Sequence, residues 1–231
     1  MAFACEHPEV TFRAEAPVFD PSLPKPGGAG YKAIKRTFDI AFSLFATAIA
    51  AIPVCLACAA VAIESPGPPI FVQERIGKDG RHIHILKIRS MYPDAHENPE
   101  RYLNEAQMRQ WTLEQKLDDD PRITHVGRIL RKTSLDELPQ FLNVLIGELS
   151  VIGPRPVTEA ETWQFANARD EFLSCKPGIT GWWQVTARND ATWESGERQQ
   201  LELFYVRHAC FGLDARIFAR TFKAIFGRTG Q

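Results

Sequence analysis

The sequence lacks an excess of charge of either sign. Its 231 residues include 27 Lys and Arg against 28 Asp and Glu, which gives a formal net charge of −1. A chain with so little net charge does not attract nucleic acid through bulk positive potential, so we predict no nucleic-acid partner. Pro (16) and Gly (15) occur at near-average frequency, which excludes a collagen-like or wholly disordered chain.

Three widespread catalytic motifs are also missing. The sequence contains no G-x-x-x-x-G-K-[ST], no G-x-G-x-x-G and no G-x-S-x-G. These absences exclude a P-loop, a Rossmann phosphate-binding turn and the nucleophile elbow of the α/β-hydrolases. Any phosphate chemistry in this protein must therefore use another arrangement of residues.

Charge is absent altogether from one long segment, residues 40–63, which has 24 residues without a single charged side chain. A continuous helix of that length is roughly 36 Å long, and a bilayer hydrocarbon core is roughly 30 Å thick. The alternative is a buried helix of a soluble protein, but such helices are seldom this long or apolar on every side. The sequence therefore predicts that this segment enters a membrane.

Pro53 lies near the middle of this segment, where a missing backbone donor and a steric clash predict a kink or break. Cations flank the segment on both sides, and such flanks tend to stay in the cytoplasm. We therefore predict a re-entrant helix–break–helix over residues 31–64, which enters and leaves the membrane by one face, with a single kinked span as the rival. The flanking cations are Lys32, Lys35 and Arg36 before the segment and Arg75, Lys78, Arg81, Lys87 and Arg89 after it.

The rest of the chain predicts a single helix-rich α+β domain with a small β-hairpin. Residues 1–30 carry five prolines and are expected to form an irregular tail. Two strands, 70–76 and 81–89, are predicted around a Gly-containing turn. Helices are expected at residues 98–117, 124–132, 136–146, 157–173, 197–208 and 213–226, with a loop at 176–181.

The last predicted helix is basic on one face and apolar on the other. Helical spacing groups Arg216, Arg220 and Lys223, a pattern that suits a helix lying in the plane of an anionic membrane surface. An ordinary surface helix that packs its apolar side on the protein core fits equally well. The apolar side carries Ile217, Phe218, Phe222, Ile225 and Phe226.

Two adjacent carboxylates, Asp136 and Glu137, are the first candidates for chemistry. Ser134 and Glu137 have the spacing of a helix capping box, which is a purely structural interpretation. Pro139 fits the interior of such a helix poorly and predicts an irregular turn. The nearby cations suit a site that handles phosphate and a divalent metal ion, so both interpretations stay open. These cations are Arg128, Arg131 and Lys132.

Three further cations are candidates for phosphate binding. Arg155 lies between Pro154 and Pro156, which fix the backbone on both sides and present the guanidinium from a rigid loop. Lys87 and Arg89 stand at the end of a predicted strand, where side-chain alternation places them on one face. Solvated surface charges are the alternative for all three.

Taken together and in order, these segments resemble the bacterial sugar transferase family, the monotopic polyprenyl-phosphate phosphoglycosyl transferases that begin lipid-linked glycan and exopolysaccharide synthesis. The resemblance covers almost everything from about Tyr31 onward. It departs from the family pattern at Ile52, where Ser often precedes the proline, and at Ala187, where Gly is usual. The matching motifs are KRTFD (35–39), SPGPPIFVQERIG (65–77), KIRSM (87–91), DDPRIT (119–124), VGRILRKTSLDELPQFLNVLIGELSVIGPRP (126–156), KPGITGWWQV (176–185) and ARND (187–190).

The resemblance implies that a sugar 1-phosphate passes from a UDP-sugar to polyprenyl (undecaprenyl) phosphate, with release of UMP. By the matched motif, Asp136 is the nucleophile that forms a covalent aspartyl-phosphosugar intermediate, and Glu137 is its partner in a Mg²⁺ site. A non-catalytic, membrane-anchored scaffold of a glycan assembly complex is the alternative. The sugar stays open among glucose, galactose and modified N-acetyl sugars.

The resemblance also implies where the protein works and what it contacts. Residues 65–231 are expected to form a catalytic domain on the cytoplasmic face of the bacterial inner membrane, with the helix broken at Pro53 held in phospholipid. A homodimer is considered as a further assembly. The candidate substrate-binding residues are Lys87, Arg89, Arg128, Arg155, Arg188 and Asn189.

Overall fold

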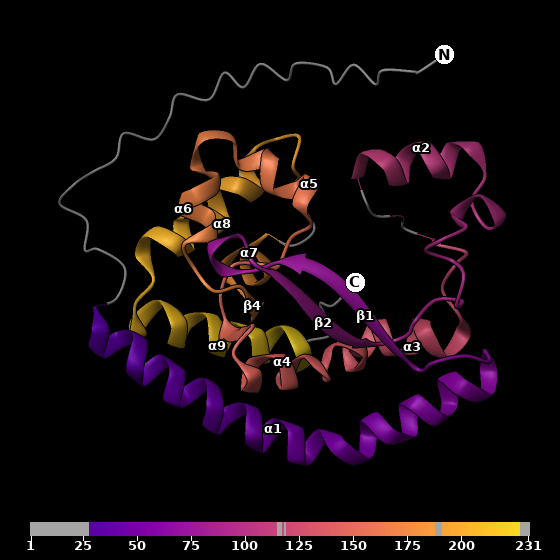
Figure 1. Ribbon diagram of the computed structural model, residues 1–231, viewed down its shortest axis with the longest axis horizontal. Coiled ribbons are helices and arrows are strands. Elements are labelled where there is room, and N and C mark those ends of the chain that lie inside the picture. The colour runs from indigo at the N-terminus through magenta and orange to yellow at the C-terminus, as the bar shows by residue number, and fades with distance from the viewer. Residues whose placement is uncertain (1–27, 115–116, 118, 188–190, 227–231) are drawn as a thin grey trace.

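The computed structural model describes residues 28–114, 117, 119–187 and 191–226. It combines helices with small sheets, as the sequence predicts, and one long helix runs along a side of the other elements (Figure 1). The elements in chain order are α1 (Ala29–Glu64), β1 (Ile70–Ile76), β2 (His82–Ile88), α2 (Glu105–Glu114), α3 (His125–Thr133), α4 (Gln140–Ile146), β3 (Ser150–Ile152), α5 (Glu159–Thr162), α6 (Arg169–Leu173), β4 (Gly178–Thr180), α7 (Trp182–Thr186), α8 (Glu197–His208) and α9 (Phe211–Phe226).

Helix α1 contains the uncharged segment and runs without interruption through Pro53. The structure thus differs from the predicted helix–break–helix, because the helix bends and does not divide. A single proline removes one backbone donor, and the apolar residues on both sides continue the helical ladder. Figure 1 shows α1 as an arc whose concave side holds α3, α4 and α9.

Both ends of α1 are attached to the same domain. Near its start, Lys35 Nζ lies 2.9 Å from Asp214 Oδ2 of α9, and Tyr31 donates a hydrogen bond to the same oxygen at 2.7 Å. At the other end, Glu64 Oε1 accepts the backbone N–H of His125 at 2.8 Å, at the start of α3. The bent helix therefore returns to the domain from which it leaves.

The β1–β2 hairpin has the strands that the sequence predicts, within one residue at each end. The two strands are antiparallel, with Phe71 opposite Lys87 and Ile76 opposite His82. A second pair, β3 and β4, is parallel and was not expected, since the sequence predicts a loop at 176–181. Each of these strands has three residues, too few for an alternating pattern to be recognisable.

Helix α9 packs its apolar side on the protein. Ile217 is fully buried in the main core, and the Phe218 ring lies 5.2 Å from that of Phe42 in α1. The basic side of the helix stays exposed. The buried part of the apolar side agrees with a helix packed on the core, whereas Phe222 of the same side stays exposed, and a position in the plane of a membrane surface stays a prediction. The side chains of Ile225 and Phe226 lie outside the described residues.

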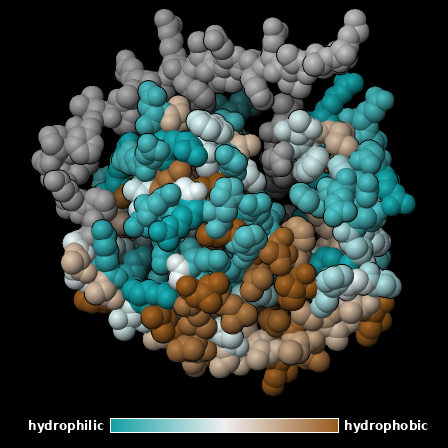
Figure 2. All heavy atoms as spheres, in the orientation of Figure 1, coloured by the Kyte–Doolittle hydropathy of each residue, from teal (hydrophilic) through white to brown (hydrophobic). Residues whose placement is uncertain are grey.

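A broad apolar surface, called here the apolar face, extends over the outside of α1 and parts of α3 and α4. Figure 2 shows hydrophobic side chains gathered along this side of the molecule. Only 11% of an 18-residue apolar window in α1 is buried, whereas the core helix of a soluble protein is mostly buried. The apolar face includes Phe45, Ile49, Ile52 and Leu56 of α1, Ile129 of α3, and Leu142 and Ile146 of α4.

Candidate active site

Asp136 lies in a short 3-10 turn, Leu135–Glu137, that joins α3 to α4. Helix α3 ends at Ser134, whose φ of 55° is left-handed and changes the direction of the chain. Ser134 makes no side-chain capping hydrogen bond, so the predicted Ser134–Glu137 capping box is wrong. Pro139 directly precedes α4, where its missing N–H costs no helical hydrogen bond. The irregular turn predicted from Pro139 is confirmed.

The Asp136 carboxyl is buried, with 9% of the residue exposed. Burial raises its pKa above the usual value, and the neighbouring charge of Glu137 raises the pKa further. The cations of Lys87 and Arg131 act in the opposite direction. A poorly hydrated carboxylate whose ionised form depends on nearby cations is a typical candidate for a reactive group.

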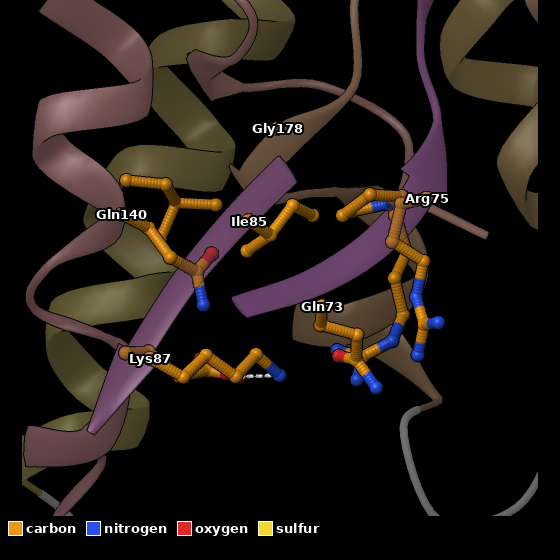
Figure 3. Close-up of a pocket in the computed structure, with 10 residues that line it drawn as sticks. Gln73, Arg75, Ile85, Lys87, Gln140 and Gly178 are labelled. Atoms are coloured by element: carbon orange, nitrogen blue, oxygen red, sulfur yellow. Dashed lines mark ion pairs between the residues drawn. The ribbon is translucent and has the colours of Figure 1, made fainter. Parts of the chain in front are cut away.

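Lys87 of β2 forms an ion pair with Glu137 of this turn. Its Nζ lies 3.6 Å from Glu137 Oε1, and both side chains are largely covered (Figure 3). Burial lowers the pKa of Lys87, while the charge of Glu137 raises it. The contact fixes the strand against the turn and brings a positive charge to the two carboxylates.

A pocket lies between the hairpin and this turn (Figure 3). Side-chain alternation places Gln73 and Arg75 of β1 on the face that also carries Lys87 of β2. Three cations and one carboxylate surround the pocket, which favours an anionic ligand; Asp136 adjoins it through Glu137. The lining residues are Gln73, Arg75, Ile85, Lys87, Glu137, Gln140, Arg155, Pro156, Gly178 and Ile179.

Arg155 reaches the pocket from the loop after β3, as the sequence suggests. The loop is held on β4, because the Gly178 N–H donates to the Pro154 carbonyl at 2.8 Å. A Cβ on Gly178 would meet the Gly153 nitrogen at 2.1 Å, so this close backbone approach requires glycine. The two prolines and the glycine contact together give Arg155 a fixed base.

Two cations of the site do not appear among the substrate-binding residues predicted from the sequence. Arg131 of α3 donates a hydrogen bond to Ser90 Oγ at 2.9 Å. Its positive charge favours the ionised form of Asp136. The left-handed conformation of Ser134 brings the end of α3 beside Asp136. No sequence pattern predicts this conformation. Arg75 lines the pocket, and strand alternation relative to Lys87 is a signal from which it could have been found.

The structure does not bring the other predicted cations to the pocket. The Arg89 guanidinium donates to the Ser65 carbonyl and lies 3.5 Å from the Gly67 oxygen, where it secures the chain after α1. Arg128 is exposed on α3, 4.0 Å from Asp119. Arg188 and Asn189 lie outside the described residues.

The donor atoms at the turn suit Mg²⁺. Asp136 and Glu137 offer hard carboxylate oxygens, and within the described part of the chain no group of three or more His, Cys, Asp or Glu side chains could hold a metal ion alone. Magnesium is usually bound by one or two carboxylates, with water and substrate phosphate completing its coordination. The two side chains therefore fit a magnesium ion that binds together with a phosphate substrate.

A cation-lined pocket beside paired carboxylates is the kind of site that handles phosphate groups, and here it stands on a domain with an exposed apolar helix. Comparison with known proteins specifies the class further. Residues 30–228 match the family described as bacterial sugar transferase, and the chain belongs to that family.

Three relatives illustrate the match. The chain is 39% identical over 199 residues to the UDP-galactose-lipid carrier transferase of Erwinia amylovora. The aligned region covers 85% of this chain and 41% of that protein. The chain is 36% identical over 202 residues to the UDP-glucose:undecaprenyl-phosphate glucose-1-phosphate transferase of Escherichia coli, with shares of 84% and 41%. It is 39% identical over 198 residues to the exopolysaccharide production protein ExoY of Sinorhizobium fredii, with shares of 83% and 84%. The chain thus spans about two-fifths of the first two relatives and most of the third.

Proposed function

We propose that the protein is a phosphoglycosyl transferase that moves a sugar 1-phosphate from a UDP-sugar to polyprenyl (undecaprenyl) phosphate and releases UMP. The observation that carries this proposal is the place of Asp136, a buried carboxylate next to Glu137 at a pocket edged by Lys87, Arg75 and Arg155. The names of the Erwinia amylovora and Escherichia coli relatives specify a UDP-sugar or a lipid acceptor, which supports the substrate classes.

The proposed reaction has two displacements at one phosphorus atom. In the first, a carboxylate oxygen of Asp136 forms a bond to the sugar-linked phosphorus of the donor, and the bond from that phosphorus to the UMP oxygen breaks. In the second, a phosphate oxygen of the polyprenyl phosphate forms a bond to the same phosphorus, and the bond to Asp136 breaks. The carboxylate is regenerated and no redox change or extra reactant is needed.

A carboxylate nucleophile needs no base at neutral pH, but it must approach a phosphorus that carries negatively charged oxygens. Fixed cations reduce this repulsion and stabilise charge on the leaving phosphate. Lys87 and Arg131 lie on the Asp136 side, whereas Arg75 and Arg155 border the rest of the pocket. We assign the first pair to the reacting phosphorus and the second pair to the remainder of the diphosphate.

Asp136 and Glu137 would hold Mg²⁺ when the donor binds. The ion supplies a Lewis acid that neutralises phosphate charge. The chain itself orients the carboxylates through the rigid turn between Ser134 and Pro139, and it excludes water from Asp136 by burial.

We further propose that α1 enters the membrane from the cytoplasmic side and returns to it. The attachment of both helix ends to one domain supports this topology, since a complete crossing would place Lys35 and Glu64 on opposite sides of the bilayer. The apolar face then lies in lipid and the pocket stays near the headgroups, where a polyprenyl phosphate presents its charged end.

The catalytic proposal is tested with purified full-length protein, Mg²⁺, polyprenyl phosphate and a panel of UDP-sugars. We expect UMP release from at least one donor, and with donor alone a sugar-phosphate adduct on the peptide that contains Asp136, seen by mass spectrometry. Asp136→Asn should abolish both signals. Asp170→Asn, at a side chain that is 97% exposed, is the matched control and should retain both.

Full activity of the folded Asp136→Asn protein would overturn the nucleophile assignment. Absence of UMP release from every donor would overturn the enzyme proposal and favour the scaffold.

The topology is tested in intact cells with single cysteines introduced by Gly30→Cys or Lys78→Cys into a cysteine-free chain. We expect neither to react with an impermeant maleimide until the inner membrane is opened; reaction of either before that step would contradict the re-entrant arrangement.

A further inference from the structure

The loop that presents Arg155 has one backbone donor at its centre. Pro154 and Pro156 have no N–H, so the N–H of Arg155 is the only one between those of Gly153 and Val157. This N–H lies 3.3 and 3.2 Å from the two carboxylate oxygens of Glu202. The backbone of the arginine is thereby tied to helix α8, while the neighbouring Pro154 carbonyl is tied to β4.

Glu202 is an unusual residue to find in this position. It is 1% exposed, and burial raises its pKa to about 7. A buried carboxylate is costly, and a well-packed apolar side chain in its place is often neutral or stabilising. Stability alone therefore gives little reason for an acid at this position. The role of Glu202 must lie in what its charge and its oxygen atoms contact.

The positive groups around Glu202 come from two places in the chain. Arg155 belongs to the loop after β3, and Arg198 lies one helical turn earlier on α8. The guanidinium carbon of Arg198 is 4.3 Å from the centre of the Trp183 ring in α7, and that of Arg155 is 5.9 Å from the same ring. Glu161 of α5 is the other acid of the group, 3.7 Å from Arg198.

These guanidinium groups repel one another in a poorly hydrated place. Burial lowers the pKa of Arg198, the charge of Arg155 lowers it further, and the charges of Glu161 and Glu202 raise it. Glu202 thus does two things for Arg155: it accepts the backbone hydrogen bond, and it offsets the repulsion from Arg198 that would push the side chain away. Neither contact involves the pocket directly, so Glu202 acts through Arg155.

We propose that Glu202 is a positioning residue that holds Arg155 in the orientation needed to bind the diphosphate of the donor. The inference rests on the proposed function for the identity of that donor. Placement matters because a displacement of about 1 Å in a site can cost on the order of 100-fold in rate. Glu202 and Arg155 should therefore behave as one unit, with the loss of either making the other almost irrelevant.

The test is a double-mutant cycle on the full-length protein in lipid nanodiscs. UDP affinity is measured by titration calorimetry, and kcat and donor KM are measured separately. We expect Glu202→Leu to weaken UDP binding and raise donor KM about 10-fold with a smaller fall in kcat, and Glu202→Gln, which keeps an acceptor oxygen, to cost about 3-fold. Arg155→Gln should add no more than about 2-fold to the effect of Glu202→Leu. Glu197→Leu and Glu197→Gln, at an exposed position on the same helix, are the controls.

Fully multiplicative losses in the cycle, or a lower unfolding temperature of Glu202→Leu with unchanged UDP affinity, would overturn the positioning role. Should Glu202→Leu fail to fold, Glu202→Gln and Glu202→Asp replace it, and wild-type affinity and KM in both would equally overturn the role. If the wild type binds UDP but releases no UMP, the proposed function fails while the coupling to Arg155 still stands or falls on the cycle. Absence of UDP binding by the wild type would overturn both.

Discussion

The Nζ atom of Lys87 lies 3.6 Å from Oε1 of Glu137, and this contact joins the β1–β2 hairpin to the turn that carries Asp136. The same cation favours the ionised form of Asp136, against burial and against the charge of Glu137. The reactivity assigned to Asp136 therefore depends on a residue nearly 50 positions earlier in the chain.

Replacing Lys87 with Gln should reduce kcat and move the acid limb of the pH–rate profile upward. As the proposed nucleophile, Asp136 would attack only when ionised, so activity should be lost as pH falls through its pKa, and removal of the Lys87 charge raises that pKa further. The measurement is kcat/KM for the donor between pH 5 and 9. Lys78→Gln, at a half-exposed turn position, should leave the limb unchanged, and an unshifted limb in Lys87→Gln would contradict the assignment.

Glu137→Gln should move the same limb in the opposite direction. The Glu137 charge raises the pKa of Asp136, so its removal lowers that pKa and extends the profile to lower pH. The maximal rate should nevertheless fall, and the Mg²⁺ concentration for half-maximal activity should rise, because one proposed metal-binding carboxylate is gone. A lower maximal rate with an unchanged Mg²⁺ concentration for half-maximal activity would show that Glu137 is not a metal ligand.

Gly178→Ala should destabilise the protein and reduce UDP binding. A Cβ at this position would lie 2.1 Å from the Gly153 nitrogen and 2.6 Å from the Gly153 Cα, so the Arg155 loop must move off β4. Overpacking of this kind costs about 1–3 kcal/mol. The control is Gly212→Ala, where no heavy atom lies within 4 Å of the added carbon. Urea unfolding and UDP calorimetry check the effect, and equal behaviour of the two variants would refute it.

Much of the scaffold could be predicted from local sequence patterns. The hairpin strands at 70–76 and 82–88 and the helix at 197–208 follow from alternation, turn residues and helical spacing, which are short-range signals. The three-residue strands β3 and β4 could not be predicted, since their pairing depends on segments about 30 residues apart. The sequence predicts a kink or a break at Pro53, and the structure has a helix that continues through this residue.

The candidate site shows the same division. Asp136, Glu137, Lys87 and Arg155 stand out by adjacency, alternation or flanking prolines, and the structure groups the last three around one pocket. Glu202 carries no local signal, because a charged residue on an ordinary helix is expected to face solvent. Only the packing of α8 against the Arg155 loop gives it a place in the site.

Ile52→Glu should weaken membrane association without disturbing the fold. Ile52 is 72% exposed at the apolar face, so the substitution removes no core contact. A charged side chain in the middle of a membrane-inserted helix costs about 2.5–3.5 kcal/mol. Trp163→Glu, at a large exposed side chain of the domain away from α1, is the control. Flotation with liposomes measures the bound fraction, and equal flotation of Ile52→Glu and wild type would contradict membrane insertion at this residue.

The stability of the protein should depend on pH through Glu202. Its pKa in the folded protein is about 7, against 4.5 for an ordinary glutamate. The folded state therefore binds this proton more tightly than the unfolded state between these values. The stability that the protonated group contributes is complete below pH 4.5 and is lost as pH rises through about 7. Over that window the loss is on the order of 3 kcal/mol.

In the Glu202→Gln variant the side chain at this position cannot titrate. The unfolding free energy of the variant, relative to that of the wild type, should therefore increase as pH rises from 5 to 8. Urea unfolding of both proteins at unit pH intervals measures the difference, and Glu197→Gln, at an exposed site on the same helix, should show no such trend. Parallel pH curves for Glu202→Gln and wild type would mean that Arg155 and Arg198 fully compensate the buried charge. In that case the carboxylate would be ionised throughout, and its electrostatic hold on Arg155 would be independent of pH near neutrality.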